Sequence, residues 1–489
     1  MSLDQLTDRQ LIGQLLCPAL FGDKLESAGE ESLRTYPPGS FIVFGRSARL
    51  AAIQDLIERH ARELPLAPVV FSDMERGAGQ QVSDLTMLPP PLAIAAAGSL
   101  TFARQAGSLT ASEARRAGIK GLFAPVADVN VEPENPIIGT RAFGDRPEQV
   151  AAYARAFVEG VHGAGGFAVA KHFPGHGDTK VDSHLGLPRV NAGRETMERV
   201  HLPPFRACIE AGVDGIMVGH LACPALGTAP DEPASQSRVV IEELLRRQLA
   251  FDGLVVTDAL NMAGATEGAS DVAALRSLEA GADVLLMPAN YRAAAVTVKN
   301  ALREGRVTRA RLMRSARRLH AWREERAASM VDTEATLARE IAESSITAPG
   351  GPTPEPFPPG TRVAVQVIDE AGENELFPAL RNELEASGWR FVASREGTCR
   401  VLVVLTRPRA WHGVASLAAE ATQEGLRFLL GATRRLVLGI GGPWFLRPFL
   451  EVSGAFLSYG SDPESLRALA RVASGSLPAR GRLPVSMPR

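Results

Sequence analysis

Short, uninterrupted apolar runs recur through the first 290 residues of this chain, and they constrain its fold more than any other feature. Each run is four or five residues long and is rich in valine, isoleucine, leucine or phenylalanine. Strands that are buried on both faces have this pattern, which is typical of parallel sheets. Seven such runs are present, at 41–44, 68–71, 122–126, 167–170, 215–218, 254–257 and 284–287.

Stretches rich in alanine, glutamate and arginine separate these runs and predict helices, for example at 147–162, 195–212 and 237–250. The segment 15–21 supplies an eighth apolar run, although it fits an opening helix equally well. Eight parallel strands that alternate with helices form a TIM-type (β/α)8 barrel. The α/β class and this barrel are therefore the predicted architecture of the first part of the chain.

Polar residues follow most of the runs, and they separate the barrel from its main alternative. Asp73, Asp128, Lys171, His220 and Asp258 lie at or just after the ends of five different runs. In a barrel these positions meet on the rim formed by the carboxyl ends of the strands. A doubly wound sheet would gather them around one switch point instead. Polar ends on so many strands favour the barrel.

A proline-rich segment divides the chain. Residues 347–360 hold six prolines and three glycines, which predicts a semi-rigid linker at 346–360 between a catalytic domain at 1–345 and a second domain at 361–489. Apolar runs alternate with helical stretches in the second domain, which predicts a small α/β three-layer sandwich. It shows no cluster of ionisable residues, so we expect a scaffolding or interface role.

The bulk properties are those of a soluble globular protein, with 45 % hydrophobic and 22 % charged residues. A net charge of −2 gives no reason to expect nucleic acid or an anionic membrane as partner. No window approaches a membrane span, and no secretory signal is visible at the start. Four widely spaced cysteines suit reduced thiols. We expect a cytoplasmic protein, as a monomer or a dimer.

One loop concentrates reactive side chains. The segment 171–184 reads K-H-F-P-G-H-G-D-T, then D-S-H after two residues, and holds three of the nine histidines. Its two glycines and Pro174 exclude a regular helix or a central strand. A polar, glycine-rich loop that follows a buried strand is where α/β enzymes place their chemistry.

The end of that loop pairs an acid with an imidazole. Asp182 can accept from one ring nitrogen of His184, which fixes the tautomer and makes the other nitrogen a better base. An isolated D-x-H would more often be a turn aspartate beside a surface histidine. A metal site built from His172, His176, Asp182 and His184 is a further alternative, but the usual zinc spacings are absent. No G-x-S-x-G serine elbow appears.

Asp258 ends the fully apolar run 254–257. It could cap a helix that begins near Ala259, because aspartate is a common N-cap. A carboxylate in that position could also serve in a pocket, as a nucleophile or to stabilise charge. Its occurrence on one predicted rim with Asp73, Lys171 and His184 favours the pocket.

Other polar residues describe a pocket for a densely hydroxylated ligand. Lys171 and His172 could pair with carboxylates, or they could grip hydroxyl groups. Arg141 lies in a long loop and offers five planar donors, and Asp73 could accept from two vicinal hydroxyls.

Together, K-H-F-P-G-H-G-D-T, D-S-H and the later T-D-A-L-N-M resemble the β-N-acetylhexosaminidases of glycoside hydrolase family 3, a group that includes bacterial peptidoglycan-recycling enzymes. The segments 123–129, 139–144 and 217–220 support the resemblance, which covers most of residues 5 to 335. The tail 475–488 is similar to the end of the family's second domain. One departure lies at 74–81, where the family's binding arginine is replaced near Gln81 and Arg76 enters earlier.

The resemblance implies that Asp258 is the nucleophile, His184 the general acid/base and Asp182 its partner. It implies further that Asp73, Arg141, Lys171 and His172 bind the nonreducing sugar, and we add His220 and Met262 to the substrate-binding residues. The expected enzyme is a retaining exo-β-N-acetylglucosaminidase that acts on muropeptides through a glycosyl-enzyme intermediate, with no metal or cofactor.

Three alternatives remain open. A β-glucosidase of the same family would take its acid/base glutamate from the second domain, which holds Glu370, Glu373 and Glu375. A phosphorylase would use phosphate in place of water, because a neutral imidazole repels anions less than a carboxylate does. A non-catalytic sugar-binding protein is the third alternative, although intact Asp258, Asp182 and His184 argue against it.

Overall fold

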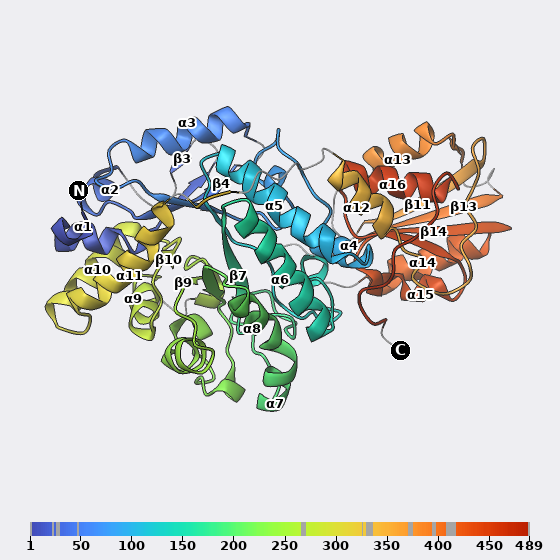
Figure 1. Cartoon of the computed structure of the whole chain (residues 1–489). Coiled ribbons are helices and arrows are strands. Elements are labelled where there is room, and N and C mark those ends of the chain that lie inside the picture. Colours follow the sequence, from blue (N-terminus) through green and yellow to red (C-terminus); the bar gives the residue numbers. More distant parts are fainter. Residues whose placement is uncertain are drawn as a thin grey trace. The chain divides into compact units, whose positions relative to one another are not determined.

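A computed structural model describes residues 2–21, 24–25, 30–45, 48–265, 270–324, 326–328, 336–369, 375–393, 398–406 and 417–487 of the chain. These residues form two compact units (Figure 1). The first unit comprises Met1–Met87, Arg104–Val129 and Pro147–Thr333. The second unit comprises Leu88–Ala103, Asn130–Arg146 and Glu334–Arg489, so the chain enters it twice before its final passage.

Parallel strands form the centre of the first unit. From β2 onward each strand pairs in parallel with the next, in the order β2, β4, β5, β6, β7, β8 and β9, and the short β3 joins β2 antiparallel. Val284 bridges β9, and β10 pairs in parallel with β1, which directly precedes β2. The bounds are β1 Leu16–Cys17, β2 Ala19–Phe21, β3 Lys24–Leu25, β4 Ser40–Phe44, β5 Val69–Ser72, β6 Gly121–Leu122, β7 Phe167–Phe173, β8 Gly215–Val218, β9 Leu254–Thr257 and β10 Leu285–Leu286. The predicted α/β class is confirmed.

Helices alternate with these strands. They are α1 Asp8–Gly13, α2 Glu30–Thr35, α3 Leu50–Ala61, α5 Leu100–Arg116, α6 Pro147–Gly163, α7 Arg194–Thr196, α8 Pro203–Glu210, α9 Ser270–Ala280, α10 Tyr291–Arg303 and α11 Arg309–His320. The predicted helix at 195–212 is interrupted by a π-helical turn at Met197–His201, because prolines at 203 and 204 start a new helix. The predicted helix at 237–250 is π-helical over Val239–Gln248.

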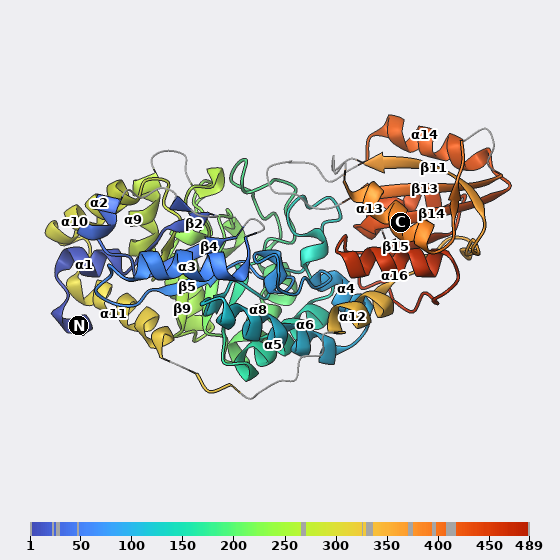
Figure 2. The same cartoon turned by 90° about the horizontal axis from the view of Figure 1, so that it is seen from above.

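Two glycines bring neighbouring helices close together. Helices α5 and α6 lie side by side (Figures 1 and 2). A Cβ atom added at Gly160 would lie 1.9 Å from the carbonyl oxygen of Arg104, and one added at Gly107 would lie 2.2 Å from that of Phe157. The backbones can therefore approach at this distance only because neither position carries a side chain.

Large aromatic side chains stack against one another in the core of the first unit. Phe71 stacks on Phe123 with ring centroids 4.9 Å apart, and Phe167 stacks on Trp322 at 4.8 Å. Trp322 directly follows α11 and is 4 % exposed.

The second unit holds a five-stranded parallel sheet in the order β12, β11, β13, β14, β15. Alternate residues of β13 contribute to two separate apolar clusters, one containing Val401 and Val403 and the other Leu402 and Val404. Helices α13 and α16 supply apolar residues to the first cluster, and α4, α14 and α15 to the second. The bounds are β11 Arg362–Asp369, β12 Arg390–Phe391, β13 Cys399–Thr406, β14 Arg434–Gly441, β15 Ala455–Ser458, α4 Pro91–Ala96, α12 Leu337–Ser345, α13 Leu376–Ala386, α14 Ala419–Leu430, α15 Arg447–Leu450 and α16 Pro463–Ala473.

The proline-rich segment 346–360, which was predicted as a linker, packs within the second unit. Thr347 exchanges both backbone hydrogen bonds with Leu457 of β15. Phe357 is fully buried, donates its N–H to the carbonyl of Ala473 and accepts from the indole N–H of Trp389. Proline fixes the backbone in an extended form, and apolar residues between the prolines anchor it.

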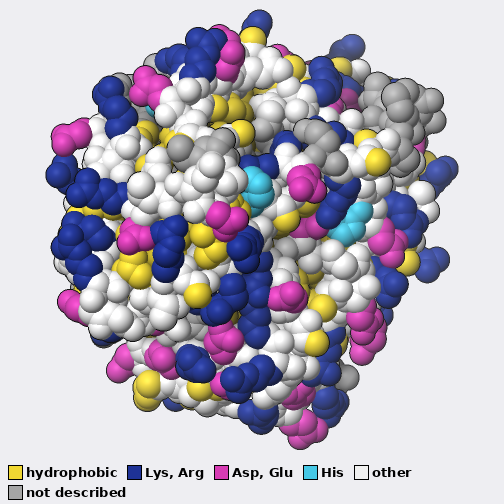
Figure 3. Space-filling model, turned by 60° about the vertical axis from the view of Figure 1, so that its left-hand side comes forward, with side chains coloured by type: hydrophobic (Ala, Val, Ile, Leu, Met, Phe, Trp, Pro, Cys, Tyr) yellow, Lys and Arg dark blue, Asp and Glu magenta, His cyan; other side chains and the backbone are white. Residues whose placement is uncertain are grey.

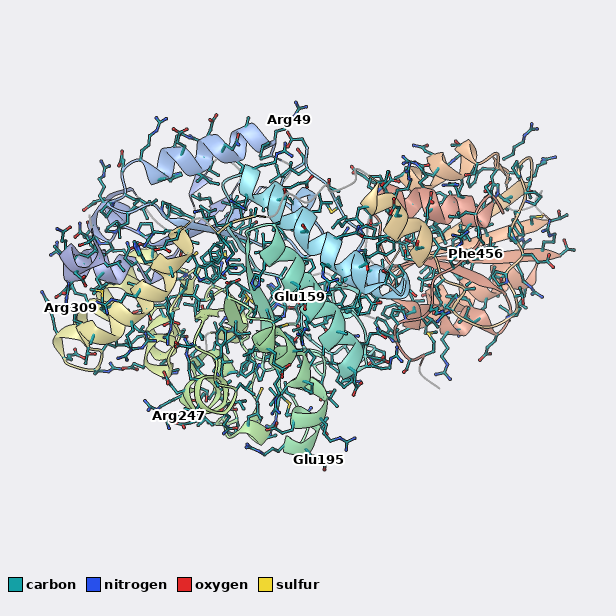
Figure 4. The ribbon with its side chains drawn as sticks, in the orientation of Figure 1. Arg49, Glu159, Glu195, Arg247, Arg309 and Phe456 are labelled. Atoms are coloured by element: carbon teal, nitrogen blue, oxygen red, sulfur yellow. The ribbon has the colours of Figure 1, made fainter. Side chains whose placement is uncertain are left out.

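Many charged side chains of the first unit are exposed. Arg247, Arg309 and Glu195 project outward from the first unit (Figure 4). Basic and acidic side chains are interspersed on the face drawn in Figure 3, as expected for a net charge of −2. None of the helices within the described ranges is long and apolar enough to cross a membrane.

Candidate active site

The site lies at the carboxyl ends of the strands of the first unit. Asp73 follows β5, His220 follows β8 and Asp258 follows β9. Strand β7 contributes two consecutive residues, Lys171 and His172, both buried. A regular strand would point them to opposite faces, but the register of β7 against β8 shifts between Ala170 and Phe173. Such a bulge re-aims side chains and is common beside active sites.

Lys171 joins two carboxylates. Its Nζ lies 2.6 Å from Oδ1 of Asp73 and 2.6 Å from Oε1 of Glu75. The side chains of Lys171 and Glu75 are 2 % and 4 % exposed, whereas that of Asp73 is 28 % exposed. Asp73 is therefore the member of this cluster that is open to a ligand. Glu75 is a site residue that was not predicted from the sequence, although its spacing of two residues from Asp73 is a signal that could have found it.

Asp128 holds His172 in one orientation. One carboxylate oxygen lies 2.7 Å from Nδ1 of His172 and 3.2 Å from its backbone nitrogen, and the other accepts the N–H of His176 at 2.6 Å. Burial acts to raise the pKa of Asp128, but the attraction and hydrogen bond of His172 outweigh it, and the pKa lies below its ordinary value. An ionised Asp128 assigns the Nδ1 proton to His172 and leaves Nε2 as the nitrogen aimed away from it.

The predicted pairing of Asp182 with His184 is present. One oxygen of the buried Asp182 carboxylate lies 2.8 Å from Nδ1 of His184 and also accepts the backbone N–H of that residue at 2.8 Å. The His184 side chain is 21 % exposed. Because a carboxylate can only accept, the proton sits on Nδ1 and Nε2 is the basic nitrogen.

Asp258 does not cap a helix as the alternative prediction had it. Its Oδ1 accepts from the N–H of the next residue, Ala259, at 2.8 Å, and a turn leads to the short 3-10 helix Ala263–Ala265. Helix α9 begins only at Ser270. The carboxylate is half-buried.

Three histidines surround Asp258 electrostatically. Burial acts to raise the pKa of Asp258, but the charges of His172, His220 and His184 lower it, and the hydrogen bond from Ala259 adds to them. The pKa of Asp258 therefore lies below its ordinary value, so the carboxylate is ionised at neutral pH. His172 lies in β7, His184 in the loop after β7, and His220 after β8. All three act on Asp258, so these four predicted site residues lie near one another.

His220 and Met262 support the loop after Asp258. Nε2 of His220 lies 3.1 Å from the carbonyl oxygen of Ala259, and Nδ1 lies 2.7 Å from Oγ of Ser235. Burial lowers the pKa of His220, although Asp258 opposes this. Met262 is 4 % exposed, and its N–H donates to Ala259. These contacts give both residues a structural part in the loop; their predicted contact with substrate stays a prediction.

Arg141 lies in the second unit, in the short 3-10 helix Gly139–Arg141. Its Nη1 donates to the carbonyl of Ile137 at 3.1 Å. Its predicted role in sugar binding stays a prediction. Gln81, near which the resemblance places the replaced arginine, has a local role: its amide nitrogen donates to the carbonyl of Asp73, and its amide oxygen accepts from the N–H of Gly45.

The alternative metal site finds no support within the described part of the chain, where no three histidine, cysteine or acidic side chains are grouped to hold a metal ion. The histidines of the proposed ligand set use ring nitrogens for hydrogen bonds to Asp128, Asp182, Thr179 and Ser183.

A family model described as the glycosyl hydrolase family 3 N-terminal domain matches residues 7–321. The chain belongs to glycosyl hydrolase family 3. This confirms the resemblance drawn from the loop 171–184 and from T-D-A-L-N-M. As a member of family 3, the chain is a glycoside hydrolase.

Within family 3, the chain is similar to β-hexosaminidases and β-N-acetylglucosaminidases. A β-hexosaminidase of Tolumonas auensis is 38 % identical over 298 residues, which are 59 % of this chain and 86 % of the relative. A β-N-acetylglucosaminidase/β-glucosidase of Cellulomonas fimi is 32 % identical over 370 residues, which are 71 % of this chain and 65 % of that one. The structure of a family 3 β-N-acetylglucosaminidase from Paenibacillus sp. str. FPU-7 superposes with a TM-score of 0.84, 28 % identity and 99 % coverage of both chains.

Proposed function

We propose that this family 3 enzyme is a retaining exo-β-N-acetylglucosaminidase that removes terminal β-linked N-acetylglucosamine through a covalent glycosyl-enzyme intermediate. The relatives from Tolumonas auensis and Paenibacillus support the amino sugar as substrate. The observation that carries the mechanism is the ionised Asp258 beside the Asp182–His184 pair, because retention requires a nucleophile and a separate acid/base.

Asp258 acts as the nucleophile in this proposal. A carboxylate that attacks the anomeric carbon must be ionised when the sugar binds, and the histidines around Asp258 keep its pKa low. Attack forms a bond from the carboxylate oxygen to the anomeric carbon and breaks the bond to the leaving group. Water later replaces the carboxylate at the same carbon.

His184 acts as the general acid and then as the base. The carboxylate of Asp182 accepts a hydrogen bond from the Nδ1–H of His184, so His184 becomes an acid when its Nε2 takes up a proton. Asp182 then stabilises the resulting imidazolium. An imidazole with a reference pKa of about 6.5 can do both tasks near neutrality. His184 protonates the departing oxygen in the first step and removes a proton from water in the second.

In this proposal Asp73 and His172 bind the sugar. Asp73, whose carboxylate is held by Lys171, accepts from sugar hydroxyl groups, and His172, which is oriented by Asp128, bonds to the same sugar through Nε2. Arg141 is a further proposed sugar-binding residue, because its guanidinium offers planar donors. We propose that the strands of the first unit form a TIM-type barrel and that the second unit is the α/β sandwich domain of the family.

The proposal also covers the natural substrate and the location of the enzyme in the cell. Peptidoglycan fragments are the natural substrate, and the enzyme works in the cytoplasm, in keeping with four buried free thiols at Cys17, Cys208, Cys223 and Cys399. The β-glucosidase alternative is supported by the Cellulomonas fimi relative, which is a β-N-acetylglucosaminidase/β-glucosidase. Of the glutamates it could use, Glu370 and Glu373 lie outside the described residues, and Glu375 directly precedes α13.

Nitrophenyl glycosides test the substrate. We expect kcat/KM for nitrophenyl N-acetyl-β-glucosaminide to exceed that for the matching β-glucoside by at least about 100-fold, because a site shaped for the acetamido group leaves buried polar groups unpaired when it is missing. Equal values would defeat the assignment. Inorganic phosphate in the same assay, with detection of a sugar 1-phosphate, separates hydrolysis from phosphorolysis.

A further inference from the structure

His176 has hydrogen-bond partners on both ring nitrogens, and their chemistry fixes its tautomer. Oγ1 of Thr179 donates to the carbonyl oxygen of His176 at 3.1 Å, so the same oxygen accepts from Nδ1 of His176 at 2.7 Å. Nδ1 therefore carries the proton. Nε2 is the acceptor, and Oγ of Ser183 donates to it at 3.1 Å.

The neutral form of His176 is the stable one. The side chain is 1 % exposed. Burial lowers its pKa to about 4, with the charge of His172 acting in the same direction and that of Asp128 opposing it. At neutral pH the ring is therefore uncharged, which the hydrogen bond from Ser183 requires.

Both partners of His176 belong to working parts of the site. Ser183 stands between Asp182 and His184, so its side-chain bond fixes the middle of the acid/base segment. The backbone N–H of His176 donates to Asp128, the carboxylate that also orients His172. One imidazole thus connects the segment with His184 to the strand end with His172.

A second contact joins the same segment to the loop of Asp258. The N–H of Gly264 donates to the carbonyl oxygen of Ser183 at 3.0 Å. A Cβ atom at Gly264 would lie 2.9 Å from that oxygen and from the carbonyl oxygen of Gly186. Ser183 is therefore held from two sides: its side chain by His176 and its backbone by the loop that follows Asp258.

We propose that His176 is a positioning residue that, through Ser183, holds His184 where it can protonate the leaving group. The proposal rests on the acid/base role of His184 given above. His176 does not take part in proton transfer itself, because both its ring nitrogens are engaged with Thr179 and Ser183. Its effect is on placement, and a displacement of about 1 Å can cost about 100-fold in rate.

Ser183→Ala and His176→Asn remove this bond in two ways. The first deletes the donor; the second keeps a donor near the Nδ1 position but deletes the Nε2 acceptor. We expect each to lower kcat/KM about tenfold or more for an N-acetyl-β-glucosaminide with a poor leaving group such as a simple alcohol. For the dinitrophenyl glycoside, which leaves without protonation, we expect a loss of less than about threefold.

Two further variants make the result specific. His184→Ala measures the complete loss of acid catalysis. We expect it to lower kcat/KM about 100-fold or more for the substrate with the poor leaving group. Ser235→Ala removes a comparable serine–histidine hydrogen bond, the one to His220, which supports the loop after Asp258. We expect it to change kcat/KM for the two substrates by the same factor. A loss of correctly folded protein would also lower both rates equally, so the ratio of the two rates is the readout.

The outcomes separate the two proposals. A selective loss in His184→Ala together with a selective loss in Ser183→Ala or His176→Asn supports the positioning role. A selective loss in His184→Ala with equal or unchanged rates in the other two overturns it and leaves the acid intact. If His184→Ala itself shows no selective loss, both the acid assignment and the positioning role fail.

Discussion

Histidines in this site differ in function because their partners differ in charge. His172 and His184 each donate Nδ1–H to a buried carboxylate, which leaves Nε2 as the nitrogen that can accept a proton. His176 and His220 are bonded to hydroxyl and carbonyl groups, and burial lowers the pKa of both rings. The sequence predicted the acid–imidazole pair from its spacing. It could not assign His176, because Thr179 and Ser183 carry no signal until the loop is folded.

Acid should destabilise this enzyme partly through His176. Its pKa in the folded state is about 4, below the ordinary value of 6.5, so the unfolded chain binds more protons between these two pH values. The free energy of unfolding therefore falls as the pH is lowered through that window, by up to about 3 kcal/mol from this group. Urea unfolding of the wild type and of His176→Asn at pH 7 and pH 4.5 measures it.

The two proteins should differ more at pH 7 than at pH 4.5, because the variant lacks the titrating ring. His201 and His220, whose pKa values burial also lowers, remain in both proteins and cancel in the comparison. The same difference at both pH values would show that His176 does not bind its proton more weakly in the folded enzyme.

At the scale of strands and loops, apolar runs predicted the order of the sheet but not its irregularities. The run 122–126 forms only the short strand β6, since Pro125 has no N–H to give a ladder. The shift in β7 that presents both Lys171 and His172 has no sequence signature, because it depends on how β8 pairs beside it.

Gly264 should be irreplaceable in the contact between the two catalytic loops. Gly264→Ala would place Cβ 2.9 Å from two backbone oxygens, of Ser183 and Gly186, and backbone cannot yield as a side chain can. We expect kcat/KM to fall about 10-fold or more, because the loops of Asp258 and His184 are pushed apart. Gly186→Ala is the matched control, since no atom lies within 4 Å of its Cβ position. Similar losses in both variants would contradict the account.

On the scale of the whole chain, the division into two units is interleaved. The second unit includes Leu88–Ala103 and Asn130–Arg146, which lie far before the proline-rich segment. Leu92 and Ala96 of α4 belong to the same apolar cluster as Leu402 and Val404 of β13. Composition identifies the proline-rich segment. It cannot show that the apolar residues of the short helix α4 are buried against strands that lie about 300 residues later in the chain.

A chain that stops at Ser345, the predicted end of the catalytic domain, should therefore be damaged. It keeps α4 but loses the strands that bury Leu92, Ala93 and Ala96, which leaves apolar surface exposed. We expect a lower thermal midpoint and aggregation, measured by scanning calorimetry and light scattering against the full chain. A truncated protein that stays monomeric with an unchanged midpoint would show that the early segments do not need the later ones.

The central claim is that Asp258 forms the glycosyl-enzyme bond while His184 serves as acid and base. Mass spectrometry of His184→Ala mixed with dinitrophenyl N-acetyl-β-glucosaminide tests it most directly, because this substrate needs no acid to react, while the missing base slows release by water. The account predicts an adduct of one N-acetylhexosamine on the peptide that contains Asp258, and none in the Asp258→Asn, His184→Ala double variant. An adduct on another residue, or one that survives in the double variant, would contradict it.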